Sequence, residues 1–296
     1  MGTPPDRTLA CLEESYLTPT VSVVVPALNE GRNLQQVFGA IPAWVLEVIL
    51  VDGHSVDDTV EVARRCRPDV RVILQNRRGK GNALACGFAA ARGDIVVMLD
   101  CDGSTDPAEI PDFVSALRNG ADFAKGSRFV AGGYSHDITR VRRMGNSFLN
   151  ALVKTLFAIR FTDLCYGYNA FWRDLVPAIG VPVGEAGEPV WGDGFEIETL
   201  MNIRVARTGA RIVEVPSIEY KRLSGASNLR AWRDGLRVLR TIVRERRRSA
   251  VDFIYVREAA IPRQGSRPVV LPDVGSGHDP RSLGRAESVV ANADGA

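Results

Sequence analysis

The stretch IVVMLDCD, residues 95–102, places two acidic residues directly after five apolar ones. A strand that is apolar on both faces is typical of a parallel sheet covered by helices on both sides. Similar short apolar strands are predicted at 21–25, 46–51 and 70–74, and a segment with helical periodicity follows each of them. Short apolar strands that alternate with amphipathic helices predict an α/β domain with a doubly wound, mostly parallel sheet.

The second half of the chain is less regular. We predict strands at 121–125 and 211–215 and helices at 140–160, around 197–205 and at 229–248. The last helix carries eight Arg against one Asp and one Glu, a net charge of 8 − 2 = +6. Gly, Pro and Ser are frequent after Tyr255 and no aromatic residue follows it, so 251–296 is predicted to be a largely disordered tail.

Composition excludes several classes of protein. The net charge of the 296 residues is only +2, which argues against a nucleic-acid partner. Five widely spaced Cys without a C-x-x-C pair, and only three His, argue against a disulfide framework and a structural zinc site. No secretory h-region and no membrane-spanning apolar run are found. We therefore expect a cytoplasmic protein, at most peripheral on the inner face of the membrane.

Acidic residues follow three of the predicted strands. The segments are Pro26-Ala27-Leu28-Asn29-Glu30, Asp52-Gly53 and Asp100-Cys101-Asp102. Ligands of such sheets bind outside the carboxyl ends of the strands. Like charges repel one another, so gathering them at one edge predicts a site shared by a cation and a ligand.

Asp100 and Asp102 give the sharpest signal of a metal site. Residues i and i+2 of an extended segment point the same way, so both carboxylates can meet one cation. Mg²⁺ and Mn²⁺ prefer oxygen ligands and commonly bind one or two carboxylates plus substrate phosphates. The alternative is that these acids cap the helix near Pro107, but Asp106 is better placed to do so.

Ordered motifs resemble a known family. VVVPALNE (23–30), VDGHSVDDT (51–59), GKGNALACGFAAARGD (79–94) and MLDCDGSTDP (98–107) are similar to the nucleotide-sugar half of family 2 glycosyltransferases with the GT-A fold. KGSRF (125–129), RRMGN (142–146), TDLCYGYNAFWRD (162–174), GFEIET (194–199) and RLSGASNL (222–229) resemble the second half. The similarity is greatest to dolichyl-phosphate mannosyltransferases and bacterial polyprenyl-phosphate glycosyltransferases, and it covers about residues 20–245.

The resemblance implies a domain organisation and a reaction. A lead-in at 1–19 would precede a Rossmann-like GT-A domain at 20–250, with a nucleotide-sugar half at 20–120 and an acceptor half at 121–250. The reaction would be metal-dependent and inverting, moving a sugar from a UDP- or GDP-sugar to an acceptor with Mg²⁺ or Mn²⁺ as cofactor.

The resemblance also implies roles for individual residues. The donor would be held by Pro26, Ala27, Asn29, Glu30, Asp52, Gly53, Asp100 and Asp102, and the metal by Asp100, Asp102 and Ser104. The acceptor or its phosphate would be held by Arg128, Arg143, Arg222 and Ser227. Ser104 stands where the family often has Gln, and Asn228 where it has Lys.

Lys80, between two glycines at a predicted helix start, could approach a phosphate or be a mobile loop residue.

The acceptor determines whether a base is needed. A phosphate is already anionic, whereas a hydroxyl or amine would need a general base. The candidates are Asp163, Asp193 and Glu196, although Asp193 could instead cap the helix that follows it.

Two acceptors and two further classes of protein stay open. RLSGASNL favours a polyprenyl phosphate, and the basic helix 229–248 could lie on an anionic membrane. Its Trp232, Leu236, Leu239 and Val243 stripe could equally pack on the core. The missing membrane span and Asn228 favour a soluble or carrier-protein-bound acceptor. A sugar-nucleotide nucleotidyltransferase would need a G-x-G-x-R loop after the first strand, and a non-catalytic protein would not need Asp100 and Asp102.

Overall fold

The computed structural model describes residues 18–181, 186–225 and 231–248. The predicted tail at 251–296, Ser227, Asn228 and most of the predicted lead-in at 1–19 lie outside these ranges. One mixed sheet forms the centre of the domain, with strand order β3-β2-β1-β4-β7-β5-β8. Its strands are β1 (Val21–Ala27), β2 (Glu47–Asp52), β3 (Arg71–Leu74), β4 (Ile95–Met98), β5 (Phe123–Ser127), β7 (Asn169–Trp172) and β8 (Ile212–Pro216).

The sheet is parallel except at β7, which runs antiparallel to both β4 and β5. β7 was not predicted, because its four residues NAFW are too short to show a period. A second, two-stranded sheet joins β6 (Tyr134–Ser135) to β9 (Ile218–Glu219). The predicted mostly parallel α/β architecture is confirmed.

Helices cover both faces of the sheet. The helices α2 (Gly31–Ala40), α3 (Thr59–Cys66) and α5 (Ile110–Arg118) pack on one face. The opposite face is covered by α4 (Lys80–Ala90), α7 (Val176–Ile179) and α8 (Ile197–Arg207). The short 3₁₀ turns are η1 (Pro107–Glu109) and η2 (Arg173–Leu175). As predicted, Asp106 caps the first of them, accepting a hydrogen bond from Ala108 N at 2.9 Å.

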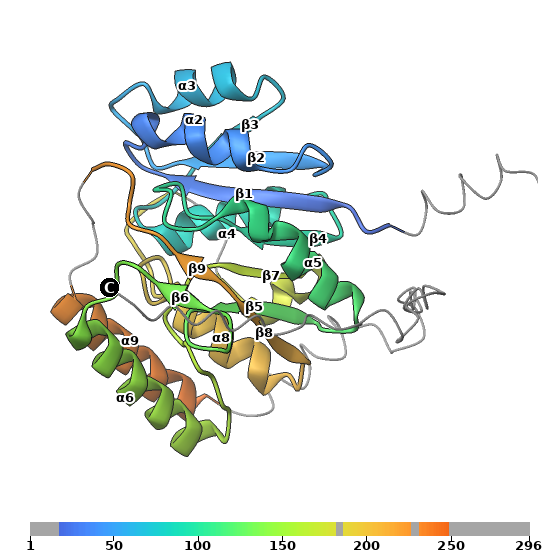
Figure 1. Ribbon diagram of the computed structural model, residues 1–296. Coiled ribbons are helices and arrows are strands. Elements are labelled where there is room, and N and C mark those ends of the chain that lie inside the picture. Colours follow the sequence, from blue (N-terminus) through green and yellow to red (C-terminus); the bar gives the residue numbers. More distant parts are fainter. Residues whose placement is uncertain (1–17, 182–185, 226–230, 249–296) are drawn as a thin grey trace, which may run out of the picture.

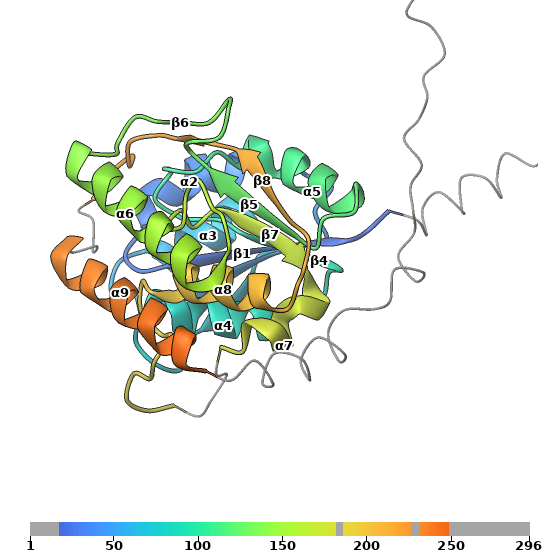
Figure 2. The same cartoon turned by 90° about the horizontal axis from the view of Figure 1, so that it is seen from below.

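Two further helices form an outer layer beyond α8. They are α6 (Arg140–Phe157) and α9 (Ala231–Arg247), which lie side by side at one end of the domain (Figures 1 and 2). Apolar residues of both helices pack with α8 in a separate small core. No helix in the described part of the chain is long and apolar enough to cross a membrane.

The buried face of α9 differs from the predicted stripe. Leu236 and Val243 are 52% and 40% exposed, whereas Val238 and Ile242 pack in the small core. The buried face also holds Glu245, which forms an ion pair with Arg204 of α8 at 3.0 Å. A search for apolar periodicity cannot detect a face that buries charged residues in pairs. Of the two alternatives for the stripe, packing on the core does not hold for Leu236 and Val243.

Glu47 fixes the amino end of the sheet. Its buried carboxylate accepts hydrogen bonds from Ser22 Oγ at 2.7 Å and Arg92 N at 2.8 Å, and it forms an ion pair with Arg71. Burial alone would raise the pKa of Glu47, but these donors outweigh it and lower the pKa to about 2. The carboxylate therefore stabilises the folded chain only while it is ionised.

We predict that Glu47→Gln lowers the free energy of unfolding by about 2 kcal/mol at neutral pH. The folded-state pKa lies below the unfolded one, so this stabilisation is complete above about pH 4.5 and lost as the pH falls towards about 2. Urea unfolding of both proteins across this range measures it. A gap between wild type and variant that stays constant down to pH 2 would contradict the assignment.

Candidate active site

The ends of β1, β2 and β4 meet at one edge of the sheet, as predicted. Ala27 pairs with Asp52 in the parallel register, and Gly53 N donates to Ala27 O at 2.8 Å. Leu99 N donates to Val24 O, which carries Asp100 to the same edge. Pro26 lies inside β1 rather than ending it, because β1 pairs with β4 only as far as Val24 and no ladder bond is lost there.

The loops after β1 and β2 are bound to each other. Asn29, whose φ of 57° is left-handed, accepts a hydrogen bond from Val56 N at 2.8 Å and donates its own N–H to Ser55 Oγ. The buried Asp52 carboxylate accepts from Ser55 N at 3.1 Å. Asparagine tolerates the left-handed conformation that this turn requires. The two loops therefore form one rigid wall of the site.

Arg222 bridges the acidic residues of two strand ends. Its guanidinium lies 2.9 Å from Glu30 Oε1 and 2.9 Å from Asp102 Oδ2. Asp102 also accepts a hydrogen bond from Ser104 N at 2.9 Å, and its carbonyl accepts from Leu223 N at 3.0 Å. The segment at 222–223 thus closes over the D-x-D loop, although about 120 residues separate the two in sequence.

Lys80 begins α4 and meets two carboxylates. Its Nζ lies 2.7 Å from Asp100 Oδ1 and 2.8 Å from Glu198 Oε1. Burial would lower the pKa of Lys80, but these two acids together raise it above its usual value. Burial raises the pKa of Glu198, and Lys80 opposes that rise. Lys80 is therefore neither a mobile loop residue nor a free phosphate ligand in this structure.

Sequence reasoning missed Glu198. It lies in the GFEIET motif, but of the two acids there Glu196 was selected, and nothing in their spacing distinguishes them. Gly167 packs against the Lys80 cluster, since a Cβ there would lie 3.1 Å from both Lys80 Nζ and Glu198 Oε1. The motifs around 167, 198 and 80 are thus brought together by tertiary contacts alone.

The donor set fits a divalent cation shared with a substrate. Glu30, Asp100, Asp102 and Glu198 face Lys80 and Arg222, a formal charge of 2 − 4 = −2. Within the described ranges, no three His, Cys, Asp or Glu side chains are arranged to hold a metal ion. A metal bound by the D-x-D carboxylates would therefore need further ligands from substrate oxygens, as Mg²⁺ commonly does.

Arg128 and Asp163 form a buried pair. The guanidinium binds Asp163 through two hydrogen bonds of 2.7 and 3.0 Å, and it reaches both oxygens of Glu219 at 3.0 Å. The plane of Arg128 lies 4.8 Å from the centre of the Tyr166 ring. Asp163 is completely buried, so its carboxylate holds Arg128 and does not face solvent. Arg128 itself is 5% exposed and is therefore not a solvated surface charge.

Asp193 and Glu196 also form hydrogen bonds within the protein. Asp193 binds Arg77 through two hydrogen bonds of 2.8 and 2.9 Å. It does not cap α8, as the alternative interpretation proposed, because Glu196 holds that position. Glu196 Oε1 accepts from Gly192 N at 3.1 Å and Gly194 N at 3.3 Å, while its buried Oε2 has no hydrogen-bond partner.

Arg143 lies beside Phe129, the ring that Arg128 also approaches. It is exposed on α6, 5.1 Å from the centre of the Phe129 ring.

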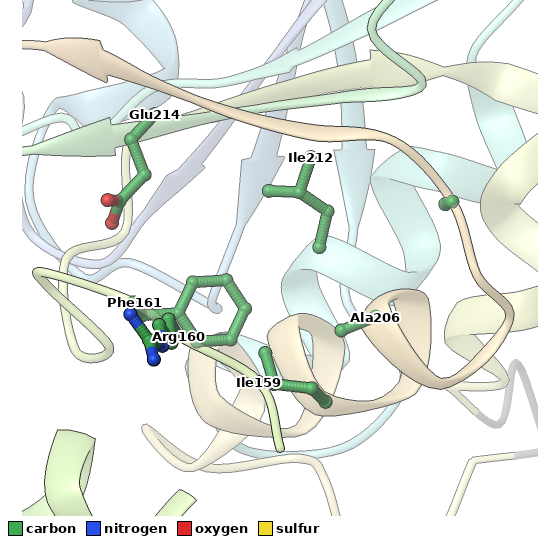
Figure 3. A pocket seen from close by; sticks show the side chains of 7 residues that line it. Ile159, Arg160, Phe161, Ala206, Ile212 and Glu214 are labelled. Carbon is green, nitrogen blue, oxygen red and sulfur yellow. The ribbon is translucent and has the colours of Figure 1, made fainter. Parts of the chain in front are cut away.

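A shallow pocket between the end of α6, α8 and β8 is separate from the strand ends, and no predicted site residue lines it (Figure 3). Five of its seven lining residues are apolar: Ile159, Arg160, Phe161, Ala206, Ala210, Ile212 and Glu214.

Comparison with known proteins shows which family this chain is similar to. The model of the family described as "Glycosyl transferase family 2" matches residues 22–179. The undecaprenyl-phosphate mannosyltransferase of Micrococcus luteus is 33% identical over 218 residues, which cover 71% of this chain and 87% of that protein. The dolichol-phosphate mannosyltransferase of Pyrococcus furiosus is 30% identical, over 71% of this chain and 59% of that protein.

A solved structure shares the fold. Glucosyl-3-phosphoglycerate synthase from Mycobacterium tuberculosis, in complex with Mn²⁺, UDP and glucosyl-3-phosphoglycerate, has a TM-score of 0.59 and 26% identity. The match covers 83% of this chain and 86% of that one.

We predict that Gly81→Ala disrupts the site by separating α4 from the loop at 192–193. A Cβ on Gly81 would lie 1.8 Å from Gly192 O, a backbone atom that cannot move cheaply. The substitution should lower the free energy of unfolding by about 2 to 4 kcal/mol and displace Lys80. Gly39→Ala is the matched control, since nothing lies within 4 Å of that helical position. Thermal unfolding should show stabilisation of about 0.5 to 1 kcal/mol for the control, and equal stabilities would contradict the prediction.

Proposed function

The chain belongs to glycosyl transferase family 2 and is a glycosyltransferase, and from that premise we propose that it transfers a sugar from a UDP- or GDP-sugar to a polyprenyl phosphate. The donor would lie at the edge formed by β1, β2 and β4. Pro26, Ala27, Asn29, Glu30, Asp52 and Gly53 would hold its nucleoside. The half at 20–120 would thus bind the donor, and the half at 121–250 the acceptor.

Mg²⁺ or Mn²⁺ would bind at Asp100 and Asp102, with Ser104 as a further oxygen ligand. The formal −2 charge of the surrounding residues supports a divalent cation, as do the Mn²⁺ and UDP of the M. tuberculosis enzyme. The bound metal would neutralise charge on the departing nucleoside diphosphate. Lys80 and Arg222 lie beside the same two carboxylates, so we assign them to the diphosphate and the incoming phosphate.

The main support for a phosphate acceptor comes from the hydrogen bonds that the three candidate bases make. Asp163 and Asp193 are each bound by an arginine through two hydrogen bonds, and Glu196 accepts from two backbone N–H groups. In this proposal the two aspartates hold arginines and Glu196 holds the backbone at 192–194, and none of the three acts as a base. A phosphate acceptor needs no such base, because its oxygen is already anionic.

The proposed step balances without a proton transfer. An acceptor phosphate oxygen attacks the anomeric carbon as the bond from that carbon to the diphosphate breaks, and the electron pair leaves with the nucleoside diphosphate. The family resemblance implies inversion at this carbon. Arg128 is surrounded by Asp163 and Glu219, so we assign it to positioning this half of the site rather than to the phosphate itself.

A lipid acceptor would be reached at a membrane surface. On α6, Val141, Met144 and Phe148 are 70%, 73% and 62% exposed, at spacings that place them on one face. On α9, Leu236 and Val243 are exposed too. Exposed arginines accompany these residues on both helices: Arg140, Arg143, Arg233, Arg240 and Arg244. Exposed apolar and basic side chains on one helix pair are typical of peripheral binding to anionic lipid.

A soluble acceptor is the second candidate. The similarity to glucosyl-3-phosphoglycerate synthase favours it, since the structures of that enzyme contain small phosphorylated acids. The basic helices could then dock an acidic carrier protein instead of a membrane. Family membership sets aside the nucleotidyltransferase and the non-catalytic interpretations.

Release of nucleoside diphosphate tests the reaction. Purified protein with Mg²⁺ or Mn²⁺ should release UDP or GDP from one sugar nucleotide of a panel, faster when a short polyprenyl phosphate is added. Asp102→Ala should reduce the rate at least a hundredfold, because it removes a metal ligand. Asp112→Ala, an exposed acid on α5, should leave it unchanged. Release that the lipid does not stimulate would move the acceptor to the soluble class.

Flotation with anionic liposomes tests the membrane contact. We expect wild-type protein to float at low salt and the double variant Met144→Asp/Phe148→Asp to remain at the bottom of the gradient. Trp44→Asp/Leu46→Asp is the matched control, since both residues are exposed but lie before β2. Wild-type protein that fails to float at low salt would overturn the membrane proposal.

A further inference from the structure

Three aromatic rings gather on the small sheet outside the main core. Tyr134 of β6 and Tyr220, next to β9, are 55% and 41% exposed, and His136 lies between them. The ring centres of Tyr134 and His136 are 4.8 Å apart, edge to face. Those of His136 and Tyr220 are 5.7 Å apart, with ring planes within 15° of parallel. We call Tyr134, His136 and Tyr220 the aromatic shelf.

The aromatic shelf is fixed to the D-x-D side of the site. Tyr220 N donates to Ser104 O at 2.8 Å, and Tyr220 lies two residues before Arg222. His136 N donates to Glu219 O at 2.8 Å, and the Glu219 side chain binds Arg128. Backbone hydrogen bonds therefore place the rings beside the residues that we assign to the metal and the phosphates.

On its other side the aromatic shelf leads to α6. β6 continues directly into the loop that enters the amino end of α6 (Figure 1). Thr139 caps this helix by accepting a hydrogen bond from Arg142 N. The exposed stripe of Val141, Met144 and Phe148 begins five residues after His136. An amphiphile with its phosphate near Arg222 and its chain directed to α6 would cross the aromatic shelf.

We propose that the aromatic shelf is the binding subsite for the isoprene units nearest the acceptor phosphate. This inference rests on the proposed polyprenyl phosphate acceptor. Tyrosine suits the position, because its ring supplies apolar contact area while its hydroxyl stays in water. Tyr134 lies in β6, and Tyr220 directly follows β9 and donates its backbone N–H to Ser104 O, so both rings are attached to hydrogen-bonded backbone before a chain covers them.

The experiment compares dimethylallyl, geranyl and farnesyl phosphate as acceptors. They share one phosphate and differ only in the number of isoprene units. For wild-type protein we expect kcat/KM to rise about tenfold or more from the shortest to the longest, mainly through KM, since added apolar area is buried. In Tyr134→Ala/Tyr220→Ala this rise should be largely lost. The affinity for nucleoside diphosphate should change by less than about twofold, because the substitutions leave the residues assigned to the donor in place.

Two control variants isolate the role of the rings. Tyr134→Phe/Tyr220→Phe keeps the rings without the hydroxyls and should retain the dependence on chain length. Trp44→Ala removes an exposed aromatic side chain elsewhere and should also retain it. Thermal unfolding of each variant shows whether the fold is intact.

The outcomes separate the two proposals. If wild-type protein transfers sugar to no prenyl phosphate, the acceptor proposal fails, and the subsite with it. If it transfers with a chain-length dependence that the double Ala variant keeps, the subsite alone is overturned. A dependence that is also lost in the double Phe variant would assign the effect to the hydroxyls and would equally overturn contact with the rings.

Discussion

Four carboxylates and two cations at the carboxyl edge of the sheet form the interaction on which the site depends. Asp100 and Asp102 follow β4, and each is held by a cation from elsewhere in the chain, Lys80 or Arg222. Without these partners the acids would repel one another. Together the four carboxylates and the two cations carry a formal charge of 2 − 4 = −2, which suits one divalent cation. Glycines at 79, 81 and 167 allow the close backbone approach that brings these partners together.

The second half of the domain is organised by buried ion pairs. Arg128 joins Asp163 to Glu219, Arg77 holds Asp193, and Arg204 joins α8 to Glu245 of α9. Removing one member would leave an uncompensated buried charge, which is far more costly than the loss of a surface pair. These pairs join segments that are far apart in sequence.

The aromatic shelf connects the site at the strand ends to the outer helix α6. The donor edge lies at the ends of β1, β2 and β4, and the shelf is bonded to it through Ser104. From the shelf the chain passes to α6, whose exposed apolar face faces away from the core. The cations that we assign to the phosphates are thus connected to α6 through the aromatic rings. This order matches the structure of an amphiphilic acceptor, a charged head followed by an apolar chain.

The sequence alone determined the features that depend on neighbours in the chain. The apolar runs defined β1, β2 and β4, and the acids that follow them marked the edge of the site, because strand direction carries every strand end of a parallel sheet to one side. It could not identify the partners of Lys80, Arg222 and Asp163, the role of Glu198, or the buried face of α9. Those depend on side chains that are brought together from distant segments, where burial in ion pairs outweighs local periodicity. Only the tertiary structure decided which lysine or arginine each of these acids binds.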